Sequence, residues 1–186
     1  AFVLNGDLDL TGSTVNLNGD LSGGTLDVLS STIVLAGDLN LTGATLNTNA
    51  STSWQTGEYT LGWDGTQAIG GDIHVQSNGS FNITGSGGTV EANVILEGGV
   101  LDIDVNSEIS GTLTHTASST IDVAASQTLT YSNANVVNIG DLTLDLAGAG
   151  AIDITAGGDF TLNDADSILQ LAGESSTSTA IISHVV

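Results

Sequence analysis

The sequence predicts an all-β fold, a parallel β-solenoid (β-helix) built from short Gly-Asp-apolar repeat units, with no significant helix. Three observations predict it: short segments repeat along the chain, apolar and polar residues alternate within them, and the chain contains no proline. The 186 residues suit one domain, or one stretch of a longer repeat array, with a substantial core. We therefore expect residues 1–186 to form a single β-solenoid domain or segment.

The clearest repeat relates residues 6–18, GDLDLTGSTVNLN, to residues 37–49, GDLNLTGATLNTN, at an offset of 31 (37 − 6). Many short strands would also suit a β-sandwich, but near-identical units, small turns and the absence of proline favour coils stacked in parallel. Two spacings between Gly-Asp pairs equal 18 (37 − 19 and 158 − 140), which suggests a coil of about that length. The Gly-Asp-apolar signal also begins at Gly19, Gly71, Gly140 and Gly158.

Each predicted strand is a short run in which every second residue is apolar. A period of two, with Val, Ile and Thr in the runs, is typical of strands that bury one face. Gly, Asn, Ser and Thr separate the runs and supply the turns between them. The runs occur in chain order at residues 8–10, 39–41, 101–105, 121–123, 142–146 and 152–154.

The charge composition is one-sided. The chain has 21 Asp and Glu residues and no Lys or Arg, so its formal net charge is −21. Each carboxylate must be solvated, hydrogen-bonded to backbone N–H groups or bound to a cation. Nucleic acids and anionic membranes are poor partners, because the basic groups that neutralise phosphates are missing. At 40% hydrophobic residues and a mean hydropathy of +0.26, the chain is too apolar for a disordered acidic tail.

The composition also favours a location outside the cell. No apolar run approaches the length of a membrane helix, so we expect no membrane insertion. Trypsin-type proteases have no Lys or Arg to cut after, and there is no Met or Cys to oxidise. These properties suit a long-lived, secreted molecule.

The Gly-Asp units resemble those of bacterial surface β-solenoid proteins, namely filamentous haemagglutinin-type adhesins and autotransporter passengers. The resemblance is carried by residues 6–12, GDLDLTG, and residues 140–144, GDLTL, and it extends over most of the chain. It implies a stiff scaffold for adhesion or secretion at a bacterial or other microbial cell surface, with no catalytic residues. The chain departs from these passengers in having no Lys or Arg.

Calcium is the cation that the carboxylates would favour. Stacked coils would bring Asp7, Asp20 and Asp38 together, and two unit charges about 5 Å apart repel by about 0.8 kcal/mol in water. The alternative is a turn, in which Gly adopts a positive φ and Asp accepts from nearby backbone donors. No EF-hand loop or calcium-binding β-roll repeat is present, and no cofactor is required. Further cation candidates are Asp102, Asp104, Asp164 and Asp166.

Enzymatic activity is not expected. Asp102 and Asp104, two residues apart on one strand face, would lie about 6.5–7 Å from each other, within the range of paired acids in glycosidases. A solvated strand face explains such pairs better, and no Arg or Lys is available to hold acidic sugars. A polysaccharide-active β-helix enzyme remains an alternative. The histidines, His74, His115 and His184, lie in separate units without zinc-site or triad spacing.

Residues 54–65 hold three of the seven aromatic residues and are predicted to be an insertion in the repeat. Trp54, Tyr59 and Trp63 could stack on a sugar, which would make the chain a carbohydrate-binding module, or contact a neighbouring subunit. Alternatively, the rings pack over a wider coil.

Four Asn-x-Ser/Thr sequons could be glycosylated in a secreted chain, although chance explains most of them in this composition: Asn40, Asn49, Asn78 and Asn82.

Neither end has the polar cap that usually protects a solenoid. Residues 173–186 begin as a Ser/Thr-rich stretch and end as an apolar one. The chain is therefore expected to be either part of a longer array or a subunit that stacks end to end. The expected function is structural: a subunit of a self-assembling extracellular filament, or a segment of an adhesin stalk that meets a glycan or host surface. The residues expected at a junction between subunits are Phe2, Val3, Leu4, Ile181 and Ile182.

Overall fold

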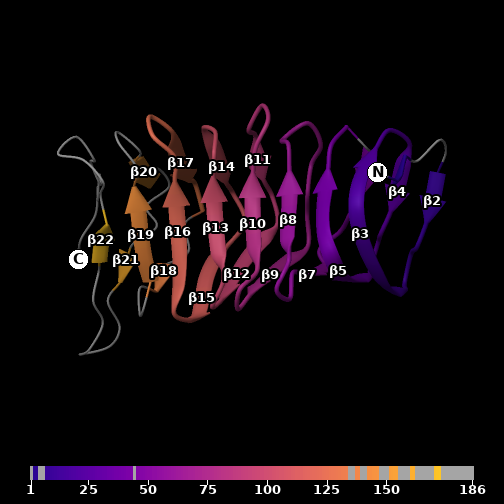
Figure 1. The fold of residues 1–186 in the computed structure, drawn as a ribbon, viewed down its shortest axis with the longest axis horizontal. Helices are drawn as coiled ribbons and strands as arrows, with labels where there is room; N and C mark the ends of the chain where they lie inside the picture. Colours follow the sequence, from indigo (N-terminus) through magenta and orange to yellow (C-terminus); the bar gives the residue numbers. More distant parts are fainter. Residues whose placement is uncertain are drawn as a thin grey trace.

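The computed structural model describes residues 2–3, 7–43, 45–133, 137–138, 142–146, 151–154, 160–161 and 170–172. In these ranges the chain forms 22 strands and no helix. Every pairing between named strands is parallel, and each strand pairs with a strand of another turn, so the predicted parallel β-solenoid is confirmed (Figure 1). Nowhere in the described ranges is there a helix with the length and apolarity to cross a membrane.

Each turn of the solenoid offers three strand positions, which we call the first, second and third faces. The strands β3 (Thr14–Ser22) and β5 (Thr32–Leu41) are long and run across both the first and second faces. The first face continues through β7 (Ser53–Gln55), β9 (Asp72–Gln76), β12 (Asn93–Glu97) and β15 (Leu113–Ala117). Two further short strands pair with each other: β18 (Val137–Asn138) and β21 (Phe160–Thr161).

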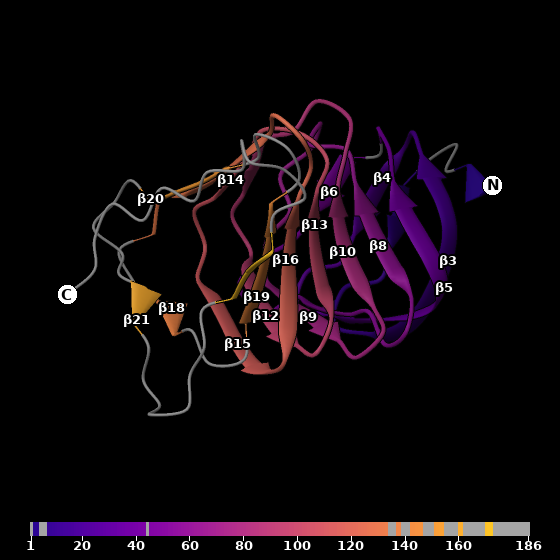
Figure 2. The ribbon, with the colours of Figure 1, turned by 60° about the vertical axis from the view of Figure 1, so that its left-hand side comes forward.

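The second face forms the longest ladder, and Figure 2 shows several of its strands in succession. It comprises β1 (Phe2–Val3), parts of β3 and β5, then β8 (Thr60–Trp63), β10 (Ser80–Ile83), β13 (Val100–Ile103), β16 (Ser119–Val123), β19 (Leu142–Leu146) and β22 (Gln170–Ala172). The third face comprises β2 (Asp7–Asp9), β4 (Thr25–Asp27), β6 (Thr45–Asn47), then β11 (Thr89–Val90), β14 (Ser107–Ile109), β17 (Thr128–Tyr131) and β20 (Ala151–Ile154).

The register shows how long each turn is. Along the second face Leu61 pairs with Phe81, Phe81 with Leu101 and Leu101 with Ile121, so the residue number rises by 20 at each turn (81 − 61, 101 − 81, 121 − 101). The coil length predicted from the Gly-Asp spacing holds for the turn from Leu8 to Leu26, where the rise is 18 (26 − 8). Most turns are longer than that spacing suggested, and their lengths differ.

The core is a set of stacked apolar columns. The alternation in each strand points every second side chain inward, as the period of two predicts. The second-face column consists of residues that are at most 3% exposed: Leu39, Leu61, Phe81, Leu101, Ile121 and Leu144. Within this column Leu61, Phe81, Leu101 and Ile121 each lie between buried counterparts in the turns before and after.

Replacement of Leu101 by Ala should therefore lower the free energy of unfolding by about 2–5 kcal/mol, because it leaves a cavity in a fully buried column. Urea unfolding followed by circular dichroism measures the change. The control is Thr120→Ala, which truncates a half-buried polar side chain on the adjacent strand β16. Equal losses in the two variants would contradict the packing described for this column.

Candidate functional site

The structure places Asp7, Asp20 and Asp38 on three different strands. Asp7 belongs to β2 on the third face, whereas Asp20 and Asp38 belong to the long strands β3 and β5. Asp20 pairs in register with Asn40, and Asp38 accepts a hydrogen bond from the Thr60 backbone N–H at 2.9 Å. The prediction of one calcium site from these three residues is therefore wrong. The two copies of the repeat, residues 6–18 and 37–49, are offset by 31 residues, which is not a whole number of turns. Their Gly-Asp units therefore lie on different faces.

Three carboxylates are instead stabilised by a side-chain amide from another turn. The Asn40 amide donates to Asp20 Oδ1 at 2.7 Å, and the Asn93 amide donates to Asp72 Oδ1 at 2.8 Å. Asn47 and Asp27 form the same bond. In each case the amide lies one turn after the acid, at the in-register position. These amide–carboxylate pairs take the place that Lys or Arg holds in other proteins.

The second face departs from this pattern at one place, where acid follows acid. Asp102, Asp122 and Asp145 occupy the same register position on β13, β16 and β19, and we call them the aspartate column. Adjacent strands lie about 4.8 Å apart, so the carboxylates are forced close together. Burial raises the pKa of Asp102 to about 6, and the charges of Asp104 and Asp122 add to the effect.

The column begins next to a buried polar atom without a partner. Asn82 on β10 is the in-register neighbour of Asp102, and its Oδ1 is buried with no hydrogen-bond donor. Asp104 is exposed and follows the end of β13. Among the residues that the structure describes, no three His, Cys, Asp or Glu side chains are placed to hold a metal ion, and we assign no metal ligand there. Asp164 and Asp166 lie outside the described residues.

The aromatic segment is part of the core. Trp54 is fully buried and Trp63 is 1% exposed, so neither indole can stack on a sugar or contact another subunit, and those predictions are wrong. Tyr59 is partly buried against the same core. Residues 54–65 include β7 and β8, which are in register with both neighbouring turns, so they are not an insertion.

The irregular segment lies directly after β8. Between β8 and β9 no strand occupies the third face, and this segment is held by the two indoles instead. Trp63 Nε1 donates to the Gln67 carbonyl at 3.0 Å, and Trp54 Nε1 donates to the Gly70 carbonyl at 3.2 Å. The alternative of rings that pack over a modified coil is therefore the correct one, and the tryptophans have a structural role here.

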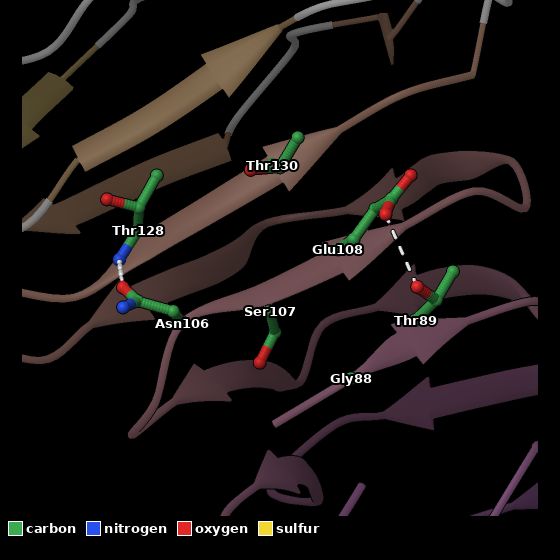
Figure 3. Close-up of a pocket in the computed structure, with 7 residues that line it drawn as sticks. All are labelled: Gly88, Thr89, Asn106, Ser107, Glu108, Thr128 and Thr130. Carbon is green, nitrogen blue, oxygen red and sulfur yellow. Dashed lines mark hydrogen bonds between the residues drawn. The ribbon is translucent and has the colours of Figure 1, made fainter. Parts of the chain in front are cut away.

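A polar hollow of about 490 Å³ lies on the third face, over β11, β14 and β17 (Figure 3). The Glu108 carboxylate accepts from the Thr89 hydroxyl at 3.3 Å and from Ser132, so two other turns hold it. Asn106 Oδ1 accepts from the Thr128 backbone N–H at 2.8 Å. The hollow is lined by Gly88, Thr89, Asn106, Ser107, Glu108, Thr128 and Thr130. The sequence analysis did not find it, because its residues converge from three turns.

The remaining predicted residues are scattered. His74 Nδ1 lies 3.1 Å from Glu97 Oε1, while His115 occupies β15 and His184 lies outside the described residues. Of the sequons, Asn40 and Asn82 lie in strands, and Asn49 is exposed but bonded to Ser30. Asn78 is exposed in a turn with a φ of 67°.

Of the residues predicted at a junction between subunits, Phe2 and Val3 form β1 beside β3. Leu4, Ile181, Ile182 and the segment 173–186 lie outside the described residues.

Comparison with protein-family models, curated proteins and solved structures finds no match to this chain. The fold and the geometry of its residues therefore carry the functional argument.

The amide–carboxylate pairs make a quantitative prediction. Asn93→Ala should lower the free energy of unfolding by about 1–3 kcal/mol, because it leaves the half-buried Asp72 without its donor. It also removes the acceptor of the Thr112 backbone N–H. A double-mutant cycle with Asp72→Ala, measured by urea unfolding, should give a coupling energy of about 0.5–2 kcal/mol. Strictly additive effects would show that the pair contributes nothing.

Proposed function

We propose that this protein is a structural β-solenoid of the microbial cell surface, either a segment of a long adhesin stalk or the subunit of an extracellular filament. The observation that carries the proposal is the second-face ladder, in which the strands from β3 to β22 stack in parallel over successive turns. A parallel stack of this kind is extended by each further turn that pairs with it.

The side chains of β2, β3 and β4 suit the same interpretation. An apolar hollow of about 270 Å³ lies between Leu8, Leu17, Leu21 and Leu26. Leu21 and Leu26 are buried, whereas Leu8 and Leu17 are only partly buried against the core. A further parallel turn would cover both residues and extend the apolar columns. That turn would come from a longer chain in a stalk, or from a second copy in a filament.

The surface position follows from composition and resemblance. Without Lys or Arg, the faces of the solenoid offer nothing to nucleic acids or anionic membranes. The Gly-Asp repeats resemble those of bacterial surface solenoids, which implies a stiff surface scaffold for adhesion or secretion. Bonded ladders on three faces give the rod its stiffness, and no catalytic step is required of it.

Negative-stain electron microscopy of the purified chain tests the proposal. Long fibres would identify a filament subunit, and isolated rods would identify a stalk segment, whereas compact particles without an axis would overturn the structural role. If fibres form, Leu17→Asp should abolish them while the β circular dichroism is retained, because a charge would enter the apolar hollow. Thr45→Asp, which adds the same charge at an exposed position of β6, should leave the fibres intact.

The polar hollow favours a second candidate function, binding of a neutral glycan. Its lining offers hydroxyl and amide groups and a single carboxylate, and no cationic group that would attract an acidic sugar. Thr130 is half-buried and lines the hollow, so its hydroxyl is the group that we expect to bond to a sugar hydroxyl. In a stalk or filament such a site would repeat along the surface.

Titration calorimetry with neutral and acidic oligosaccharides tests this candidate. Thr130→Ala should weaken binding of a neutral oligosaccharide by about 3- to 10-fold, the usual effect of one lost hydrogen bond. Thr45→Ala, on a distant strand of the same face, should not change it. Equal binding by both variants, or a preference for acidic sugars, would contradict a site in the hollow.

A further inference from the structure

The aspartate column is the one place in the described structure where a second-face carboxylate is followed by another carboxylate in register. Two elements flank Asp102 in the sheet. From β10 it meets Asn82, which is neutral, and from β16 it meets Asp122. Asp104 is the nearest acid on its own segment, and Asp145 lies one strand beyond Asp122. No cationic side chain faces Asp102 from either flanking strand.

This environment penalises a negative charge on Asp102 from both sides. Toward β16 it meets a like charge at the spacing of one strand. Toward β10 its in-register neighbour is Asn82, whose buried Oδ1 is an acceptor that has no donor. A carboxylate can give nothing to that oxygen, because an ionised acid only accepts hydrogen bonds. A protonated carboxyl group can donate, and it also ends the repulsion by Asp122.

We propose that Asp102 is a proton-operated stabiliser of the solenoid: in mildly acidic solution it takes up a proton from solvent, donates its O–H to Asn82 Oδ1 and no longer repels Asp122. The inference does not depend on the proposed stalk or filament role. One proton is gained for each chain, and no covalent bond changes. The ladder through β10, β13 and β16 is tighter in the protonated state.

The direction of the pH effect follows from linkage. The pKa of Asp102 in the folded chain is about 6, above its ordinary value of 3.8. The folded state therefore binds more protons than the unfolded state between these pH values. Stability contributed by this group is fully present below about pH 4 and is lost as the pH rises through about 6. General charge repulsion falls over the same range, so a variant must separate the two effects.

Asp102→Asn supplies a neutral donor at every pH. Compared with the parent chain, it should melt roughly 3 °C higher at pH 8 and rise less on acidification to pH 5. The matched control is Glu91→Gln, which removes one charge from an exposed position and also leaves a net charge of −20 (−21 + 1). The control should keep the full pH dependence of the parent. Thermal unfolding by circular dichroism at both pH values gives the comparison.

Carbon-13 NMR of the aspartate carboxyl groups gives an independent readout. The Asp102 signal should titrate with a midpoint near 6, and the Asp122 signal should shift with it. A midpoint near 4 would overturn the proposal, as would equal melting behaviour of Asp102→Asn and Glu91→Gln. A gain in melting temperature with calcium at pH 8 that Asp102→Asn abolishes would also overturn it, because a cation would then neutralise the column.

Discussion

The surface of this solenoid depends on one constraint. Its negative charges are stacked at the spacing of a β-sheet, and the chain has no Lys or Arg to neutralise them. Every outward position lies about 4.8 Å from its counterparts in the adjacent turns, so each carboxylate needs a neutral neighbour. Three kinds of donor meet this need: side-chain amides for Asp20 and Asp72, hydroxyl groups for Glu108, and a backbone N–H for Asp38. In the aspartate column, by contrast, the in-register neighbour of a carboxylate is another carboxylate.

The interior depends on apolar packing and not on charge, because its apolar columns run without a break from turn to turn along the axis of the solenoid. A single turn on its own could not bury its leucine side chains. The turns stacked on either side of it supply the apolar surface that covers them. Where the third face lacks a strand, the indoles of Trp54 and Trp63 hold the backbone through hydrogen bonds at their buried edges. Large aromatic rings therefore compensate for a missing strand, and their polar N–H groups satisfy backbone carbonyls that a sheet would otherwise pair.

The sequence predicted the fold and the inward or outward direction of individual side chains. Alternation correctly buries Leu101 and Ile103 and turns Asp102 outward. It could not predict which residues are stacked on one another, because register between turns depends on the length of the corners, and corner residues carry no periodic signal. Asp20 consequently meets Asn40 and not Asp38. The sequence left the tryptophans open between a surface and a core position, because Gln, Glu and Asp surround them, and the structure buries both indoles.

The unequal turns have a consequence for how such a chain can change during evolution. On the second face the residue number rises by 22 from Leu39 to Leu61 (61 − 39) and by 20 from Leu61 to Phe81 (81 − 61), yet all three side chains remain in one column. Insertions and deletions at corners are thus absorbed locally, whereas a single-residue change within a strand would turn its apolar side chains to solvent. The corners are free to diversify, so a lineage can vary its loops and its overall length while the scaffold beneath them is inherited unchanged.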